Sequence, residues 1–387
     1  MNDRMRNSYI PTLDGWRAIA VCLVIAAHSQ PMLRNSQTAA GTLIANLLVH
    51  TGFGVDIFFA LSGYLICTLL LQEKARTGTI SLGRFYTRRV FRILPPILLY
   101  LATLLTLVKF GFIPQIPTAD FLRVLFFARN YYLGPWYTGH FWSLAVEEHF
   151  YLVAPVFFLL LPWRRALRIA LLLVLVCIGI RWYEFSHLLT TNSLPQFRTE
   201  NRFDALLWGG ILALVLQSTS LRKRAAAYVT GTTALATSIA AAMLLNVVPG
   251  HPFRRTVVAM ALPILISYTV LHPDRWFGRL LENKYLRWLG RISYSLYIWQ
   301  MPFLVEGERP LGLLQSFPLA LVLPFLCAVA SYYCLEKPMI RIGHQLAASP
   351  GETPNGRFER PVRSRIQTLS PLTRAGVSAS HPGVDAS

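Results

Sequence analysis

Charged side chains are scarce in this chain. They make up 14% of its 387 residues, whereas 54% of the residues are apolar. A soluble globular protein carries about 25% charged residues, so the composition argues against one and favours a membrane protein. Acidic residues are the scarcer kind, with 18 Asp and Glu against 37 Lys and Arg. A basic excess can indicate nucleic-acid binding, but membrane proteins gather Lys and Arg in cytoplasmic loops. We therefore expect a lipid bilayer, and no nucleic acid, as a partner.

Several chemical motifs are absent as well. The sequence has no glycine-rich phosphate loop, no nucleophile elbow and no zinc-ligand spacing. Its five cysteines lie in or at the end of apolar runs and show no ligand spacing. We therefore expect no disulfide framework and no metal site. There is also no internal repeat and no extra soluble domain.

Long apolar runs are what the chain has in abundance. Each is close to the roughly 20 residues that a helix needs to cross about 30 Å of hydrocarbon. We therefore predict an all-α, polytopic membrane protein with about ten transmembrane helices. Their expected positions are 14–33, 46–72, 89–110, 141–162, 167–186, 203–218, 225–247, 254–272, 292–306 and 314–336. Residues 121–128, in a stretch rich in Pro, Gly and aromatic residues, are expected to form a short interfacial or re-entrant piece.

The connecting loops predict the orientation. With the N-terminus inside, the inner segments hold nineteen Lys and Arg and the outer loops hold eight. This asymmetry favours both termini in the cytoplasm and a location in the cytoplasmic (inner) membrane. Residues 1–343 would form the membrane domain, and 344–387 a disordered basic cytoplasmic tail. The first apolar run could pass for a signal peptide, but nine further spans and its flanking charges argue against cleavage.

The first predicted span carries three ionisable residues in a line. Arg17 and His28 are eleven residues apart, which places them on one helix face, separated by roughly 16 Å along the axis. Asp14 lies about one turn before Arg17 on the same stripe. Ionisable residues inside a membrane are costly and usually functional. Since 16 Å is too far for joint action on one atom, either the helix is broken or the two residues serve different parts of a long substrate.

Two further segments carry polar residues near a span. Ser62 is explained by a packing seam of small residues with Gly63, whereas a buried Asp56 needs a partner or must be neutral. Arg89 and Arg92 belong to a cation cluster. The cluster is either a membrane anchor that reaches lipid headgroups or a site where guanidinium groups bind phosphate.

The segment 140–152 holds adjacent carboxylates at the start of a span. Ser143, Glu147 and Tyr151 share one helix face, whereas Glu148 and His149 are expected at the outer mouth. A carboxylate in a low-dielectric environment takes up a proton or holds a cation. An imidazole on a neighbouring helix would be a natural partner for Glu147.

In their order and spacing, these segments resemble the acyltransferase-3 family, integral membrane proteins that O-acylate surface glycans, exported polysaccharides and some antibiotics. The resemblance covers about residues 8–343, including Leu335-Glu336-Lys337-Pro338. One departure is Gln300, where many members carry His after the Trp. The motifs are Leu13-Asp14-Gly15-x-Arg17-x10-His28, Val55-Asp56-x-Phe58-Phe59-x2-Ser62-Gly63, Arg89-x2-Arg92-x2-Pro95, Trp142-Ser143-Leu144-x2-Glu147 and Ile292-Ser293-Tyr294-Ser295-Leu296-Tyr297.

The resemblance implies transfer of an acyl group, most often acetyl, from cytoplasmic acyl-CoA to a hydroxyl of a carbohydrate or lipid-linked glycan acceptor. No cofactor would be bound, since acyl-CoA is a substrate. His28 would act as general base and Glu147 would orient it. Arg17 would balance charge or bind the donor, with Asp14 as its partner.

Arg89 and Arg92 would hold the CoA phosphates. Asp56, Ser62 and Tyr151 are further candidates for substrate contact. An acyl-His28 intermediate is an open variant of the mechanism. Two other classes also stay open, namely a transporter or flippase of an anionic or glycan-linked substrate and a structural partner in polysaccharide export. The oligomeric state is not predicted.

Overall fold

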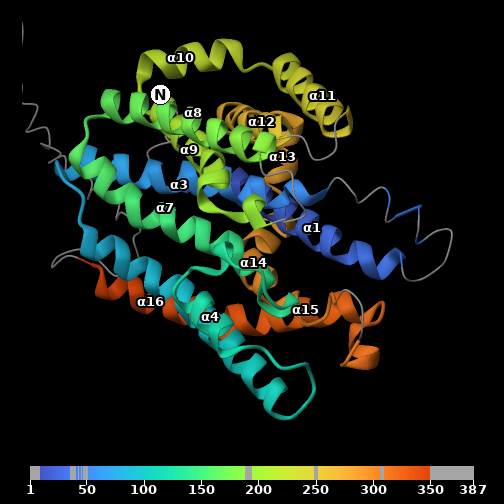
Figure 1. Cartoon of the computed structure of the whole chain (residues 1–387). Helices are drawn as coiled ribbons and strands as arrows, with labels where there is room; N and C mark the ends of the chain where they lie inside the picture. The colour runs from blue at the N-terminus through green and yellow to red at the C-terminus, as the bar shows by residue number, and fades with distance from the viewer. Residues whose placement is uncertain are drawn as a thin grey trace, which may run out of the picture. The chain divides into compact units, whose positions relative to one another are not determined.

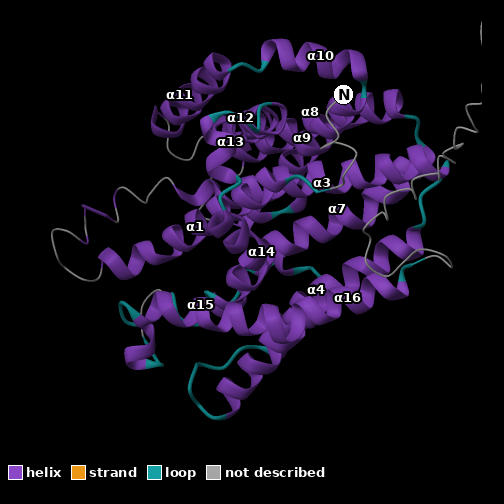
Figure 2. Cartoon of the chain, turned by 180° about the vertical axis from the view of Figure 1, so that it is seen from behind, coloured by secondary structure: helices purple, strands orange, loops and turns teal. Residues whose placement is uncertain are grey.

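All regular secondary structure in the described part of the chain is helical (Figure 2). The computed structural model describes residues 9–34, 41, 43, 44, 46, 51–187, 194–247, 252–305 and 309–348. The predicted all-α class is thus confirmed for these residues. The predicted tail lies outside the described residues from 349 onward, so its disorder and the domain boundary at 343 stay predictions.

Each of the ten predicted segments overlaps a helix (Figure 1). The last one continues from α15 through a π-helical turn, Tyr332–Glu336, into α16, Lys337–Leu346, which lies along α4. The ten helices are α1 (Pro11–Arg34), α3 (Gly54–Thr77), α4 (Leu82–Lys109), α7 (Phe141–Leu160), α8 (Trp163–His187), α9 (Thr199–Gln217), α11 (Gly231–Val247), α12 (Pro252–Leu271), α14 (Lys284–Trp299) and α15 (Leu319–Ser331).

Fewer of these helices meet the requirements of a complete span. Within the described residues, six are long and apolar enough to cross a membrane, or seven if the bent pair α9 and α10 (Thr219–Tyr228) is one span. In contrast, α14 has 16 residues and carries two cations, Lys284 and Arg287, in its first turn. At 1.5 Å per residue it covers only about 24 Å. The count of ten spans and the inward orientation of the termini therefore stay predictions.

Short helices fill the connections. The segment expected at 121–128 overlaps α5 (Thr118–Leu125), which confirms a short helix there but not its place in a membrane. It is followed by a 3-10 turn at Arg129–Tyr131 and by α6 (Trp136–Gly139), which leads directly into α7. The remaining short elements are α13 (Trp276–Leu281) and 3-10 turns at Thr51–Phe53, Leu194–Phe197 and Gly312–Gln315.

Helices α3 and α9 touch at two glycines. A Cβ atom on Gly63 would lie 1.9 Å from the carbonyl oxygen of Leu206, and one on Gly209 would lie 2.1 Å from that of Ala60. Small residues allow helix backbones to approach this closely in a membrane protein. The packing seam expected beside Ser62 is confirmed for Gly63, and it fixes the position of α3 next to the candidate site.

Helices α1 and α14 pack in the same way and run in the same direction. A Cβ on Gly290 would lie 1.8 Å from the carbonyl oxygen of Asp14. Fourteen residues further along α1, His28 contacts Gln300, which directly follows α14. The polar stripe of α1 is therefore held against α14 at both ends.

We expect Gly209→Ala to lower the free energy of unfolding by about 1–3 kcal/mol, because the added methyl group must push α3 and α9 apart. Thermal unfolding of the purified protein in detergent measures the effect. The matched control is Gly179→Ala in α8, where a Cβ meets nothing within 4 Å. Equal melting temperatures for the two variants would contradict the tight crossing.

Candidate active site

The first helix is continuous from Pro11 to Arg34. A break between Arg17 and His28, one of the two explanations for their separation, is therefore wrong. The predicted pair at its start is confirmed, since Arg17 Nη1 lies 3.4 Å from Asp14 Oδ1. Tyr9 donates a 2.6 Å hydrogen bond to Asp14 Oδ2. Partial burial, and then this bond, raise the pKa of Tyr9, so the phenol stays a donor.

The predicted cation cluster divides into two pairs. Arg84 and Arg88 lie 3.6 Å and 3.8 Å from the carboxylate of Glu73 and are thus neutralised. Arg89 and Arg92 form no ion pair or side-chain hydrogen bond with the residues that the structure describes. The Arg89 guanidinium instead lies 5.3 Å from the centre of the Tyr151 ring. Two guanidinium groups are therefore left to bind an anion.

These two arginines gather near the start of α1. Arg17 is within electrostatic range of Arg92 and Glu147, and Arg89 is within range of Arg17. The side chain of Arg17 remains 25% exposed despite its place inside the helix bundle. Guanidinium groups from α1 and α4 thus converge at one end of the stripe, which we call the Arg17 end.

Glu147 belongs to the Arg17 end as well. Its Oε2 accepts hydrogen bonds from Ser62 Oγ at 3.1 Å and Tyr151 Oη at 2.7 Å. The structure thereby brings together Ser62, Tyr151 and Glu147 from the predicted set. The expected pairing of Glu147 with His28 is wrong, since His28 bonds to Gln300 instead. The physical reason is the length of α1, which carries His28 roughly 16 Å beyond Arg17 along the helix.

The contact with Gln300 determines how His28 is protonated. His28 Nδ1 lies 3.2 Å from Gln300 Oε1. The amide nitrogen of Gln300 donates to the carbonyl oxygen of Tyr297 at 3.0 Å, so its oxygen must be the atom that faces His28. An amide oxygen only accepts, and therefore Nδ1 carries the proton. In the neutral ring Nε2 is then a free acceptor, the form that a general base requires.

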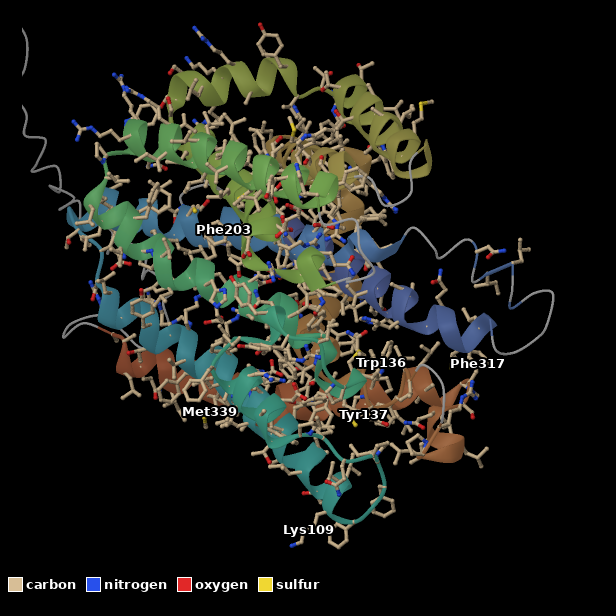
Figure 3. The ribbon with its side chains drawn as sticks, in the orientation of Figure 1. Lys109, Trp136, Tyr137, Phe203, Phe317 and Met339 are labelled. Atoms are coloured by element: carbon tan, nitrogen blue, oxygen red, sulfur yellow. The ribbon has the colours of Figure 1, made fainter. Side chains whose placement is uncertain are left out.

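Two more residues surround His28, and sequence reasoning did not include either among the site residues. The ring of Trp136, labelled in Figure 3, stands edge-on to His28 at 5.9 Å between centroids. The buried His140 lies within electrostatic range of His28. Both come from α6 and its junction with α7. The only signals in the sequence were the aromatic content of this stretch and the position of His140 directly before the segment that contains Trp142, Ser143 and Glu147.

A buried arginine holds this loop in place. Arg129 Nε donates to Thr138 Oγ1 at 3.2 Å, and Arg129 Nη2 contacts the carbonyl oxygen of Pro135 at 3.5 Å. Nη1 binds the carbonyl oxygen of Tyr132. Trp136 therefore lies between two residues that Arg129 binds. Arg129 thus fixes the loop that carries Trp136 next to His28. We call this other end of the stripe, around His28, the His28 end.

Asp56 belongs to a different ionic group. Its Oδ1 lies 3.1 Å from Arg202 Nη2, and that guanidinium also lies over the rings of Phe59 and Trp142 at 5.5 Å and 5.1 Å. The expectation that Asp56 needs a partner is confirmed. The structure does not bring it to Arg17 or His28, so its predicted role in substrate contact gains no support.

Comparison with known proteins identifies the chain. The family model described as an acyltransferase domain matches residues 10–335. The chain belongs to the acyltransferase-3 family. Together with the apolar helices, this membership makes it an integral membrane protein. No group of three His, Cys, Asp or Glu in the described residues could hold a metal ion.

Two relatives show the extent of the similarity. The O-acetyltransferase OatA of Staphylococcus aureus (strain NCTC 8325 / PS 47) is 30% identical over 390 residues, which cover 92% of this chain and 61% of the relative. OatA of strain MRSA252 is 30% identical over 376 residues, which cover 88% and 58%. The acyltransferase-3 chain thus spans about three fifths of the relatives' length. No solved structure matches it.

We expect Asp56→Ala to destabilise the acyltransferase-3 chain by about 3–5 kcal/mol, because it leaves the buried Arg202 without its charge partner. The free energy of unfolding in detergent, obtained by denaturant titration, measures the loss. The double variant Asp56→Leu with Arg202→Met removes both charges and should recover most of the stability. If Asp56→Ala were as stable as the unaltered protein, the ion pair between Asp56 and Arg202 would contribute nothing to stability.

Proposed function

We propose that this chain transfers an acetyl group from cytoplasmic acetyl-CoA to a hydroxyl of a glycan or lipid-linked glycan on the other side of the cytoplasmic membrane. The observation that carries the proposal is the hydrogen bond between His28 and Gln300, because it leaves Nε2 of His28 as a base. Family membership and the printed name of the relatives, O-acetyltransferase, support acyl transfer as the reaction.

The Arg17 end suits the donor. CoA carries several phosphate charges, and guanidinium groups bind phosphate through paired hydrogen bonds. Arg89 and Arg92 are available for this task, whereas Arg84 and Arg88 are bound to Glu73. The positive-inside asymmetry of the sequence supports an orientation with this end toward the cytoplasm, where acyl-CoA is made.

The length of the site suits a long donor. Because α1 is continuous, Arg17 and His28 remain roughly 16 Å apart. A donor whose phosphates lie at the Arg17 end would extend its flexible arm along α1 and present the thioester near His28. The separation that excludes joint action on one atom thus fits two parts of the same molecule.

The reaction follows from the protonation of His28. Nε2 takes the proton of the acceptor hydroxyl while the oxygen attacks the thioester carbonyl carbon. The carbon–sulfur bond then breaks, an ester forms, and the imidazolium returns its proton to the CoA thiolate. Gln300 Oε1 keeps its bond to Nδ1–H throughout and so holds the ring in place. The same tautomer would also allow Nε2 to carry the acetyl group as an intermediate.

We expect His28→Ala to lower acetyl transfer by about 10²–10⁴-fold, the range for the loss of a general base. Release of CoA and acetylation of the acceptor by purified protein measure the effect. His187→Ala, at an exposed histidine near the end of α8, is the control and should keep its activity. Full turnover in His28→Ala would contradict the assignment. Absence of CoA release by the unaltered protein would favour the transporter alternative.

We expect Arg89→Gln to raise the KM for acetyl-CoA by about 10–100-fold, since a hydrogen bond to a charged group contributes about 1.5–3 kcal/mol. The KM for the acceptor should not change. Arg88→Gln is the matched control, because this neighbouring guanidinium is paired with Glu73. Equal donor KM values for the two variants would contradict the phosphate role of Arg89.

A further inference from the structure

Five aromatic side chains form a cluster at the His28 end. His140 contacts the rings of Tyr100 and Tyr297 at 5.4 Å and 5.5 Å between centroids, and Tyr100 contacts Trp299 at 5.7 Å. Trp136 stands against His28 itself at 5.9 Å. Tyr100, His140, Tyr297 and Trp299 are linked by these ring contacts, and we include with them Trp136, which contacts His28, and call the five residues the aromatic cluster.

The two tyrosine hydroxyls of this cluster are hydrogen-bonded. Tyr100 donates to the carbonyl oxygen of Tyr137 at 2.7 Å, and Tyr297 donates to that of His140 at 2.8 Å. Tyr297 also shares a hydrogen bond with Ser143 at 2.5 Å. These contacts fix the backbone at the start of α7 and hold the ring positions. The cluster therefore has a rigid shape.

The ring nitrogens of the cluster, in contrast, have no hydrogen-bond partner in the described part of the chain. Both ring nitrogens of His140 are buried without a partner among the described residues, and so are Nε1 of Trp136 and Nε1 of Trp299. The whole side chain of His140 is only 2% exposed. Buried polar groups in folded proteins almost always have a hydrogen-bond partner. Unpaired nitrogens on a fixed framework beside a catalytic histidine indicate a site for a polar ligand.

We propose that the aromatic cluster is the acceptor subsite and that it selects a polyhydroxylated acceptor. This inference rests on the proposed function, which names a glycan acceptor, and adds the residues that recognise the acceptor hydroxyls. A neutral imidazole has one donor and one acceptor, and an indole has one donor. Neighbouring hydroxyls, each of which donates and accepts, match that set, while one hydroxyl donates to Nε2 of His28. The apolar faces of the rings cover the carbon atoms of the same ligand.

Selectivity follows from the unpaired nitrogens. A site that is built to hydrogen-bond a hydroxyl strongly rejects an analogue that lacks it, because the buried polar groups then stay unpaired. A monohydric alcohol can satisfy His28 alone. A sugar, or glycerol as its smallest stand-in, can satisfy His28, His140 and Trp136 together.

The test measures CoA release by the full chain in lipid nanodiscs, with glycerol, methyl glucoside and 1-propanol as acceptors. We expect the unaltered protein to use both polyols at least tenfold better than 1-propanol by kcat/KM. His140→Phe keeps the ring and removes both nitrogens, so this preference should disappear while the KM for acetyl-CoA stays the same. His149→Gln is the control, since this α7 histidine bonds Thr199 outside the cluster.

Each outcome decides the proposal. An unchanged polyol preference in His140→Phe overturns the subsite but leaves the proposed function intact, because CoA is still released. A parallel rise in the KM for acetyl-CoA also overturns it, since that result shows a general structural effect. If His140→Phe does not fold, Trp136→Phe, which removes Nε1 and keeps a single aromatic ring, tests the same preference. No CoA release by the unaltered protein overturns the proposed function and the subsite together.

Discussion

The close packing of α1 against α14 is the constraint on which the site depends. Gly290 lets the backbones touch at Asp14, and Gln300 binds His28 at the other end. Because both ends are fixed, α1 can neither slide nor rotate against its neighbour. Arg17 is thereby held near α4 and α7, and His28 near α6. A single helix thus defines two chemically different ends of one site.

The two ends differ in their electrostatics. The Arg17 end gathers guanidinium groups and carboxylates, and its acid Glu147 is held by the hydroxyls of Ser62 and Tyr151. The His28 end is built from aromatic rings and a neutral amide. An amide stabilises an imidazolium less than a carboxylate would, which favours a neutral, basic imidazole at rest. A charged donor would therefore bind at the Arg17 end, and an uncharged polyol acceptor would bind at the His28 end.

The sequence was informative for helices and for contacts between residues of the same helix. Each of the ten predicted apolar segments overlaps a helix, and helical spacing predicted the contacts of Asp14 with Arg17 and of Glu147 with Tyr151. Contacts between helices depend on tilt, rotation and depth, which spacing does not encode. The sequence therefore missed Arg202 as the partner of Asp56 and joined His28 to the wrong residue. Gln300 was noticed only as a departure from the family pattern, although it is the residue that orients His28.

The protonation of His28 is the central claim, and it can be observed directly. Solution or solid-state NMR of the protein labelled with ¹⁵N-histidine, with His28→Gln to assign the signal, distinguishes the two neutral tautomers. The account predicts a proton on Nδ1 and an unprotonated Nε2. A neutral ring that carries its proton on Nε2 would leave no free base toward the substrate and would contradict the account.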